Sequence, residues 1–95
     1  MATARYLHIS FNFEGKPPAN KVLEDVFNSA LDWYRYAPNC WILYTTTEAV
    51  EWSERCRKVL PATNSILVIE FDLSNKTGYL QKSVWEWLHK DRNKS

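Results

Sequence analysis

The clearest pattern in this sequence is an alternation of residues near its N-terminus. Leu7, Ile9, Phe11 and Phe13 occupy one set of alternate positions, and Tyr6, His8, Ser10 and Asn12 occupy the other. Alternation with a period of two predicts a β-strand, Tyr6–Phe13, with one fully apolar face. The Gly and Pro residues of Glu14–Pro18 cannot continue a ladder and predict a loop after this strand.

Two later stretches have the three- and four-residue spacing of amphipathic helices. The first is Lys21–Leu31, whose apolar positions are Val22, Leu23, Val26, Phe27, Ala30 and Leu31. The second starts near Thr47 and ends before Pro61, because proline stops a helix. Its predicted core positions are Ala49, Trp52, Cys56 and Val59.

The region Asp32–Thr46 between these helices allows two interpretations. In one, the first helix extends through Tyr36 and only Cys40–Thr46 forms a strand. In the other, Trp33–Ala37 and Cys40–Thr46 are two strands joined by a turn at Pro38-Asn39. Strand-forming aromatic and β-branched residues, together with the turn chemistry of Pro-Asn, favour the hairpin.

The remaining elements predict the fold class. Ser65–Leu73 is expected to be a strand with Leu67, Ile69 and Phe71 beneath the helices, and a helix is expected from Ser83 to about Asp91. The order strand, helix, strand, strand, helix, strand predicts an α+β, ferredoxin-like βαββαβ antiparallel sheet with an extra C-terminal helix. In that plan the first strand lies between the third and the last.

Composition narrows the class of protein. The 95 residues fit one domain, 1–95, of which 91–95 are expected to be a disordered tail. A formal net charge of +1 argues against bulk electrostatic binding to nucleic acid. The sequence has no long apolar stretch and no secretion signal, so we expect a cytoplasmic protein that makes no membrane contact. Cys40 and Cys56 have no metal-ligand spacing and are expected to be buried and reduced.

The sheet face opposite the two main helices needs a cover, because about half of it is apolar. It would display the Tyr6–Asn12 row together with Ile66, Val68, Glu70 and Asp72, and either Trp41 and Leu43 or Ile42 and Tyr44. The terminal helix, a second copy of the chain or nucleic acid could cover it. Trp85 and Trp87 cannot both face one narrow seam, so we expect one of them to contact another subunit or the rest of the sheet.

Candidate site residues follow from this face. A partner or nucleic acid would contact Tyr6, Arg35, Trp41, Trp85 and Trp87, since aromatic rings can stack on bases and arginine can bind phosphate. Weak catalytic candidates are His8, Asn12, Glu70 and Asp72, with His8 and Glu70 within reach of each other on neighbouring strands. Glu70 and Asp72 lie two positions apart on one predicted strand. Two carboxylates at this spacing do not complete a cation site. We therefore predict no metal and no cofactor, with Mg²⁺ required only if the protein is a nuclease.

Three motifs carry a family resemblance. They are Tyr-Leu-x-Ile-Ser-Phe-Asn-Phe from Tyr6, Trp-Tyr-x-Tyr from Trp33, and Gly78-Tyr-Leu-Gln-Lys with Trp85-Glu-Trp-Leu. With these motifs the chain resembles small bacterial SinR-like proteins, which are related in fold to the second CRISPR-associated protein. The resemblance implies a ferredoxin-like homodimer. In the CRISPR-associated relatives an aspartate at the end of the first strand is linked to metal-dependent nuclease activity, and Asn12 stands at the matching position here.

These observations predict a non-catalytic, dimeric interaction module that binds protein or nucleic acid. One alternative is a metal-dependent endoribonuclease or DNase, which the amide of Asn12 disfavours because it is a poorer Mg²⁺ ligand than a carboxylate. The other alternative is a phage- or plasmid-coded inhibitor or antitoxin.

Overall fold

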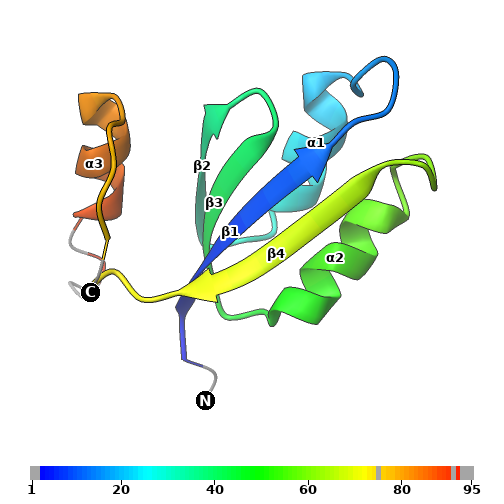
Figure 1. The fold of residues 1–95 in the computed structure, drawn as a ribbon. Helices are drawn as coiled ribbons and strands as arrows, with labels where there is room; N and C mark the ends of the chain where they lie inside the picture. Colours follow the sequence, from blue (N-terminus) through cyan, green and yellow to red (C-terminus); the bar gives the residue numbers. More distant parts are fainter. Residues whose placement is uncertain (1–2, 75, 91, 93–95) are drawn as a thin grey trace.

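The computed structural model describes residues 3–74, 76–90 and 92, which form one four-stranded antiparallel sheet and three helices (Figure 1). In chain order the elements are β1 (Arg5–Asn12), α1 (Asn20–Phe27), β2 (Asp32–Ala37), β3 (Cys40–Thr45), α2 (Ala49–Arg57), β4 (Ser65–Phe71) and α3 (Lys82–Leu88). The sheet order is β2-β3-β1-β4, so the first strand lies between the third and the last, as predicted. Helices α1 and α2 cover one face of the sheet, and α3 lies on the other (Figure 1).

The central strand β1 follows the alternation of its sequence. Leu7, Ile9 and Phe11 are buried, while the residues between them are partly exposed. The strand begins at Arg5 and ends at Asn12, one residue earlier at each end than predicted. The apolar face of β1 therefore forms the centre of the core.

The main core lies between the sheet and helices α1 and α2. Its buried members are Leu7, Ile9, Phe11, Leu23, Phe27, Trp41, Leu43, Trp52 and Cys56. The ring of Trp41 lies 5.4 Å from that of Phe11, edge-on, and 5.4 Å from that of Phe27. Aromatic pairs prefer such tilted and edge-on arrangements, so these rings hold α1 against the sheet.

Both main helices end before the residues at which the sequence predicted their ends. α1 ends at Phe27, because the chain turns there and the backbone N–H of Ala30 donates to the carbonyl of Phe27 at 2.9 Å. Leu31, which was predicted to face the core, is consequently exposed. α2 ends at Arg57, so the predicted core residue Val59 is exposed as well.

The hairpin interpretation of the middle region is confirmed, and the extended helix is wrong. β2 and β3 pair antiparallel around the turn at Pro38-Asn39, with Tyr34 opposite Ile42. The side-chain amide of Asn39 donates to the carbonyl of Phe11 at 3.0 Å and ties the turn to β1. This pairing points Trp41 towards the helices and Ile42 towards the opposite face.

The orientation predicted for β4 is wrong. The register pairs Ile9 with Val68 and Ser10 with Leu67, so Val68 lies on the helix-covered face and Leu67 on the other. Ile69 pairs with His8 and also lies on the face opposite the main helices. Both faces of β4 carry apolar residues, so the sequence does not show which face is covered. Only the pairing with β1 decides which face lies under the helices.

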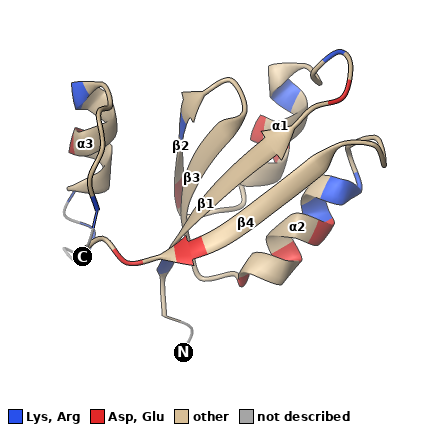
Figure 2. Ribbon diagram, viewed as in Figure 1, with Lys and Arg blue, Asp and Glu red and all other residues tan. Residues whose placement is uncertain are grey.

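Charged residues lie mainly on the helices, in the loops and near the ends of strands (Figure 2). On α2, Arg55 and Glu51 form an ion pair at 2.8 Å with the i, i+4 spacing. On α1, Lys21 and Asp25 form a similar pair at 3.2 Å. Within the described part of the chain, basic residues do not gather into a stripe across the sheet (Figure 2).

Candidate functional site: the open face of the sheet

We call the sheet face opposite α1 and α2 the open face. Its side chains are Tyr6, His8, Ser10, Tyr34, Tyr36, Cys40, Ile42, Tyr44, Leu67, Ile69 and Phe71. Four of these residues are tyrosines, contributed by three neighbouring strands. The open face is therefore rich in tyrosine where β2, β3 and β1 lie side by side, whereas β4 contributes the aliphatic residues Leu67 and Ile69 and the aromatic Phe71.

Helix α3 covers the aromatic part of this face, as one of the three expected covers. Val84, Trp87 and Leu88 pack on Ile42 and form a second core separate from the main one. The Trp87 ring lies 6.0 Å from the ring of Tyr34. The helix predicted from Ser83 to about Asp91 is shorter in the structure: α3 begins at Lys82 and ends at Leu88, before the described residues His89 and Lys90. Asp91 itself lies outside the described residues.

The two tryptophans of α3 are buried to different extents, although Trp85 packs against the same second core as Trp87. Contact of one of them with another subunit stays a prediction. Trp87 is turned into the second core and is 9% exposed. Trp85 is only partly buried and stacks on His89, with the ring centres 6.3 Å apart. Trp85 also lines a groove that runs between α3 and β4.

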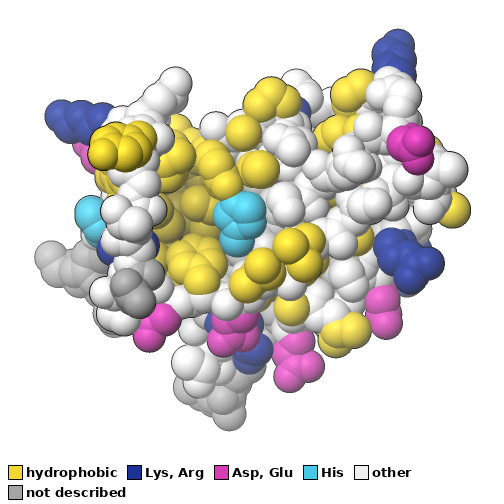
Figure 3. Space-filling view, in the orientation of Figure 1, with side chains coloured by type: hydrophobic (Ala, Val, Ile, Leu, Met, Phe, Trp, Pro, Cys, Tyr) yellow, Lys and Arg dark blue, Asp and Glu magenta, His cyan; other side chains and the backbone are white. Residues whose placement is uncertain are grey.

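This groove is a largely apolar hollow on the open face. It encloses about 280 Å³ and is lined by His8, Tyr36, Ile42, Ile69, Phe71, Lys76, Thr77, Leu80, Trp85 and Leu88. Figure 3 shows hydrophobic side chains gathered between α3 and the sheet at this place. The groove is at the small end of the range for ligand pockets, so its size suits an inserted side chain better than a cofactor.

Two polar groups face each other on the floor of the groove. Nε2 of His8 and the hydroxyl of Tyr36 are hydrogen-bonded across the strands. Burial lowers the pKa of His8 below 6.5 because the charged imidazolium loses solvation. Burial and the neighbouring Cys40 thiol raise the pKa of Tyr36 to about 12. Near neutral pH both side chains are uncharged, and the phenol can donate to the imidazole.

The weak catalytic candidates are not brought together. Glu70 pairs in register with Leu7 and lies on the helix side, where its carboxylate accepts from Arg5 at 3.2 Å. His8 points to the open face, so the expected approach of His8 and Glu70 is wrong. Asn12 is exposed at the end of β1.

Asp72 follows β4, and its side chain is hydrogen-bonded to the backbone two residues later. Its carboxylate accepts from the backbone N–H of Ser74 at 2.9 Å, and the bonds from Ser74 lower its pKa. Over residues 3–74, 76–90 and 92, no three His, Cys, Asp or Glu side chains are placed to share a metal ion.

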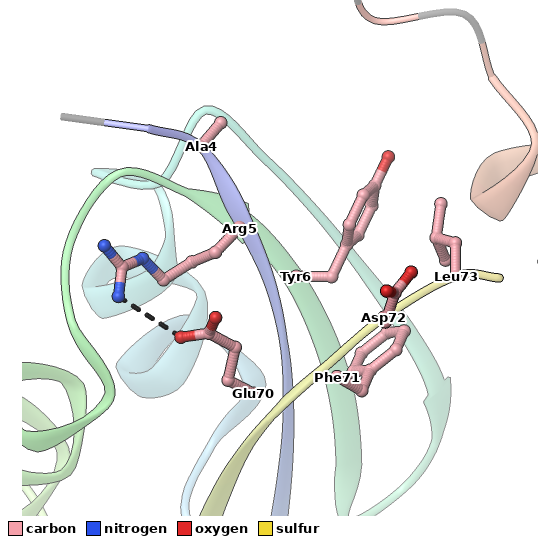
Figure 4. Close-up of a pocket in the computed structure, with 7 residues that line it drawn as sticks. All are labelled: Ala4, Arg5, Tyr6, Glu70, Phe71, Asp72 and Leu73. Atoms are coloured by element: carbon pink, nitrogen blue, oxygen red, sulfur yellow. Dashed lines mark hydrogen bonds and ion pairs between the residues drawn. The ribbon is translucent and has the colours of Figure 1, made fainter. Parts of the chain in front are cut away.

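A larger hollow of about 640 Å³ lies between the start of β1 and the end of β4 (Figure 4). It is lined by Ala4, Arg5, Tyr6, Glu70, Phe71, Asp72 and Leu73. Figure 4 shows the Arg5–Glu70 pair on one side of the β1 backbone and the rings of Tyr6 and Phe71 on the other. Because its polar and aromatic residues face different sides of the sheet, they do not converge on one ligand.

Two of the predicted partner-binding residues belong to the helix side. Trp41 is 1% exposed in the main core, so it cannot stack on a base. The guanidinium of Arg35 lies 4.7 Å from the centre of the Trp41 ring and donates to Asn20 Oδ1 at 2.7 Å and to the Pro38 carbonyl at 2.6 Å. Tyr6, Trp85 and Trp87, in contrast, lie together on the open-face side.

The sequence pattern missed Asp32 and Arg92. Arg92 was assigned to the tail, yet its guanidinium binds Asp32 at 2.6 Å and only 8% of its side chain is exposed. These residues lie 60 positions apart, and an isolated arginine in a basic C-terminal segment carries no signal of such a contact. Residues 91 and 93–95 lie outside the described residues.

The cysteines differ in environment. Cys56 is buried, as expected, and its pKa is raised to about 12 because burial disfavours the thiolate. Cys40 is only partly buried, contrary to expectation. Neither forms a disulfide within the described part of the chain.

Comparison of the sequence with protein-family models and with curated proteins, and of the structure with solved structures, finds no match. Among the residues that the structure describes, no helix is long and apolar enough to cross a membrane.

Proposed function

We propose that this protein is a non-catalytic, homodimeric interaction module with a ferredoxin-like fold. The fold assignment is supported by the element order, in which the six elements before α3 run β-α-β-β-α-β. It is further supported by the sheet, in which β1 and β4 are neighbours and the β2–β3 hairpin lies beside β1. Membership of the SinR-like group remains a prediction from the sequence motifs.

The exposed edge of β4 is the observation that carries the dimer. β4 is at the edge of the sheet and, in the described part of the chain, pairs only with β1. Leu67 and Ile69 are 56% and 48% exposed along it. Natural edge strands are usually protected by lysine, proline, bulges or a covering segment. The one charged residue of β4, Glu70, is engaged by Arg5.

The sequence of β4 is compatible with pairing to a second copy. If two β4 strands pair antiparallel about a two-fold axis at Val68, Leu67 of each copy lies opposite Ile69 of the other, on the open face. Apolar cross-strand pairs of this kind stabilise a sheet by roughly 0.2–1 kcal/mol each. The pairing also satisfies backbone groups along seven residues of each strand.

The groove adjoins this proposed interface, because Ile69 lines both. A dimer would therefore present two grooves near its two-fold axis. Their apolar lining favours protein side chains over nucleic acid as the bound partner. The open-face tyrosines are packed against α3, and the net charge of +1 provides little attraction for phosphate.

Light scattering after size exclusion tests the dimer. The wild-type chain of 11.2 kDa is expected to elute with twice that mass. Leu67→Lys combined with Ile69→Lys is expected to give a monomer, because two charges would face the opposing strand. The matched controls are Leu31→Lys and Val50→Lys, which alter apolar residues elsewhere that are somewhat more exposed and should leave the dimer intact.

A wild-type monomer at millimolar concentration would overturn the dimer, as would equal dissociation by the control variants. The same runs with mixed short RNA and DNA test the alternative partner, and no co-elution is expected. Incubation of labelled RNA and DNA with Mg²⁺ or Mn²⁺ tests the nuclease alternative. Cleavage that is lost in His8→Ala would contradict a non-catalytic role.

A further inference from the structure

Arg92 is bound more completely than a surface arginine. Its Nη1 donates to Asp32 Oδ2 at 2.6 Å, its Nη2 to the carbonyl of Trp87 at 2.8 Å, and its Nε to the hydroxyl of Tyr6 at 3.0 Å. Three donors of one planar group thus have three separate acceptors. An ammonium group, a compact point charge without the fork, cannot reach the same three acceptors at once.

Aromatic rings surround the same guanidinium. Its central carbon lies 4.3 Å from the centre of the Trp87 ring, 5.0 Å from that of Tyr44 and 5.8 Å from that of Tyr6. All three distances are within the about 6 Å range of cation–π attraction. The rings and the Asp32 carboxylate therefore form a cage of the type that selects cations by shape and charge.

The walls of this cage come from four different elements. Tyr6 belongs to β1, Asp32 begins β2, Tyr44 belongs to β3, and Trp87 belongs to α3. A cation in the cage consequently ties α3 to three strands. This matters because α3 has only seven residues and is too short to be a stable helix on its own.

We propose that Tyr6, Tyr44, Trp87 and Asp32 form a guanidinium-binding site whose ligand is the chain's own Arg92, and that the bound arginine latches α3 over the open face. When the arginine leaves, α3 is released and uncovers Ile42 and the tyrosines beneath it. This site is independent of the β4 edge. The carboxyl of Asp32 carries the negative charge that the bound guanidinium needs. Burial acts to raise the pKa of this carboxyl, but hydrogen bonds from Arg92 and Lys90 outweigh burial and lower the pKa.

Hydrogen exchange of the full chain, followed by NMR, tests the latch. Arg92→Ala is expected to lower the protection of α3 amides about tenfold to a hundredfold, the range for loss of charged hydrogen bonds, and to leave β1 amides protected. Arg92→Lys should lose nearly as much, because lysine lacks the fork. The matched control is Lys90→Ala, which removes an exposed partner of the same carboxylate, 3.2 Å from Asp32 Oδ2, and should change protection less than threefold.

Chemical rescue distinguishes a binding site from mere packing. N-methylguanidinium at low millimolar concentration, far below denaturing levels, should restore most α3 protection in Arg92→Ala. Methylammonium at the same concentration should not. Equal rescue by both cations, no rescue by either, or equal effects of Arg92→Ala and Lys90→Ala would overturn the proposal. If Arg92→Ala fails to fold, the same rescue is measured on Arg92→Lys.

Discussion

The presence of two separate cores predicts that the same substitution will destabilise the whole fold on one face of the sheet and only α3 on the other. Leu43 and Leu88 are both buried, at 0% and 4% exposure. Leu43 belongs to the main core under α1 and α2, whereas Leu88 belongs to the second core under α3. Leu→Ala at each site removes the same atoms, so any difference between the two variants reports how each core is connected to the rest of the fold.

The magnitudes follow from burial. Leu→Ala in a packed core costs about 2–5 kcal/mol. A domain of this size has a free energy of unfolding of roughly 5–14 kcal/mol, so Leu43→Ala should remove a large part of it. Leu88→Ala removes a similar amount from a seven-residue helix that is held by three buried side chains of its own. That loss should detach α3 from the sheet. It should not unfold the rest of the chain, because the main core does not depend on α3.

The assay combines urea denaturation with native-state hydrogen exchange. Leu43→Ala should shift the urea midpoint strongly and lower protection in every element. Leu88→Ala should lower protection in α3 alone and shift the midpoint much less. The two-core description is refuted if Leu88→Ala destabilises α1, α2 and β1 as much as Leu43→Ala does.

Two further predictions concern single titratable groups. Because the pKa of His8 is lower in the folded chain than in the unfolded one, the unfolded chain binds the proton more readily; stability should be full above pH 6.5 and fall as the pH drops below it. Tyr36, the titratable group hydrogen-bonded to His8, stays neutral near this pH because its pKa is raised to about 12. Thermal unfolding of His8→Gln should therefore lose this dependence, and a dependence that survives would contradict the assignment. A thiol reagent should label Cys40 in the native protein and reach Cys56 only after unfolding, because Cys56 is buried with a pKa of about 12. Equal native labelling rates of the two thiols, measured by mass spectrometry, would refute that ordering.

Local patterns were sufficient for much of the fold. The alternation in β1 has apolar residues on one side only, so its buried face could be assigned from the sequence alone. Pro38-Asn39 between two runs of strand-forming residues likewise predicted the hairpin. The order of these elements then predicted that β1 would be central, with α1 and α2 on one face.

Partners distant in the chain decided the candidate site. β4 is apolar on both sides, so the sequence could not tell whether Leu67 or Val68 would be covered, and the pairing with β1 decided it. β3 had the same ambiguity. Its pairing with β1 placed Trp41 in the core and Ile42 on the open face.

The alternating residues Tyr6, His8 and Ser10 of β1 correctly predicted which side chains lie on the open face. Their spacing did not predict which residues of other elements contact them. Tyr36 reaches His8 from another strand, and the tyrosines are covered by α3, a helix distant from them in the sequence. Arg92 finds Asp32 only once β2 and α3 are packed together. Short-range periodicity thus determined which residues form strands and helices, whereas the strand register and the packing of α3 decided which side chains meet, because contacts between distant segments leave no periodic trace in the sequence.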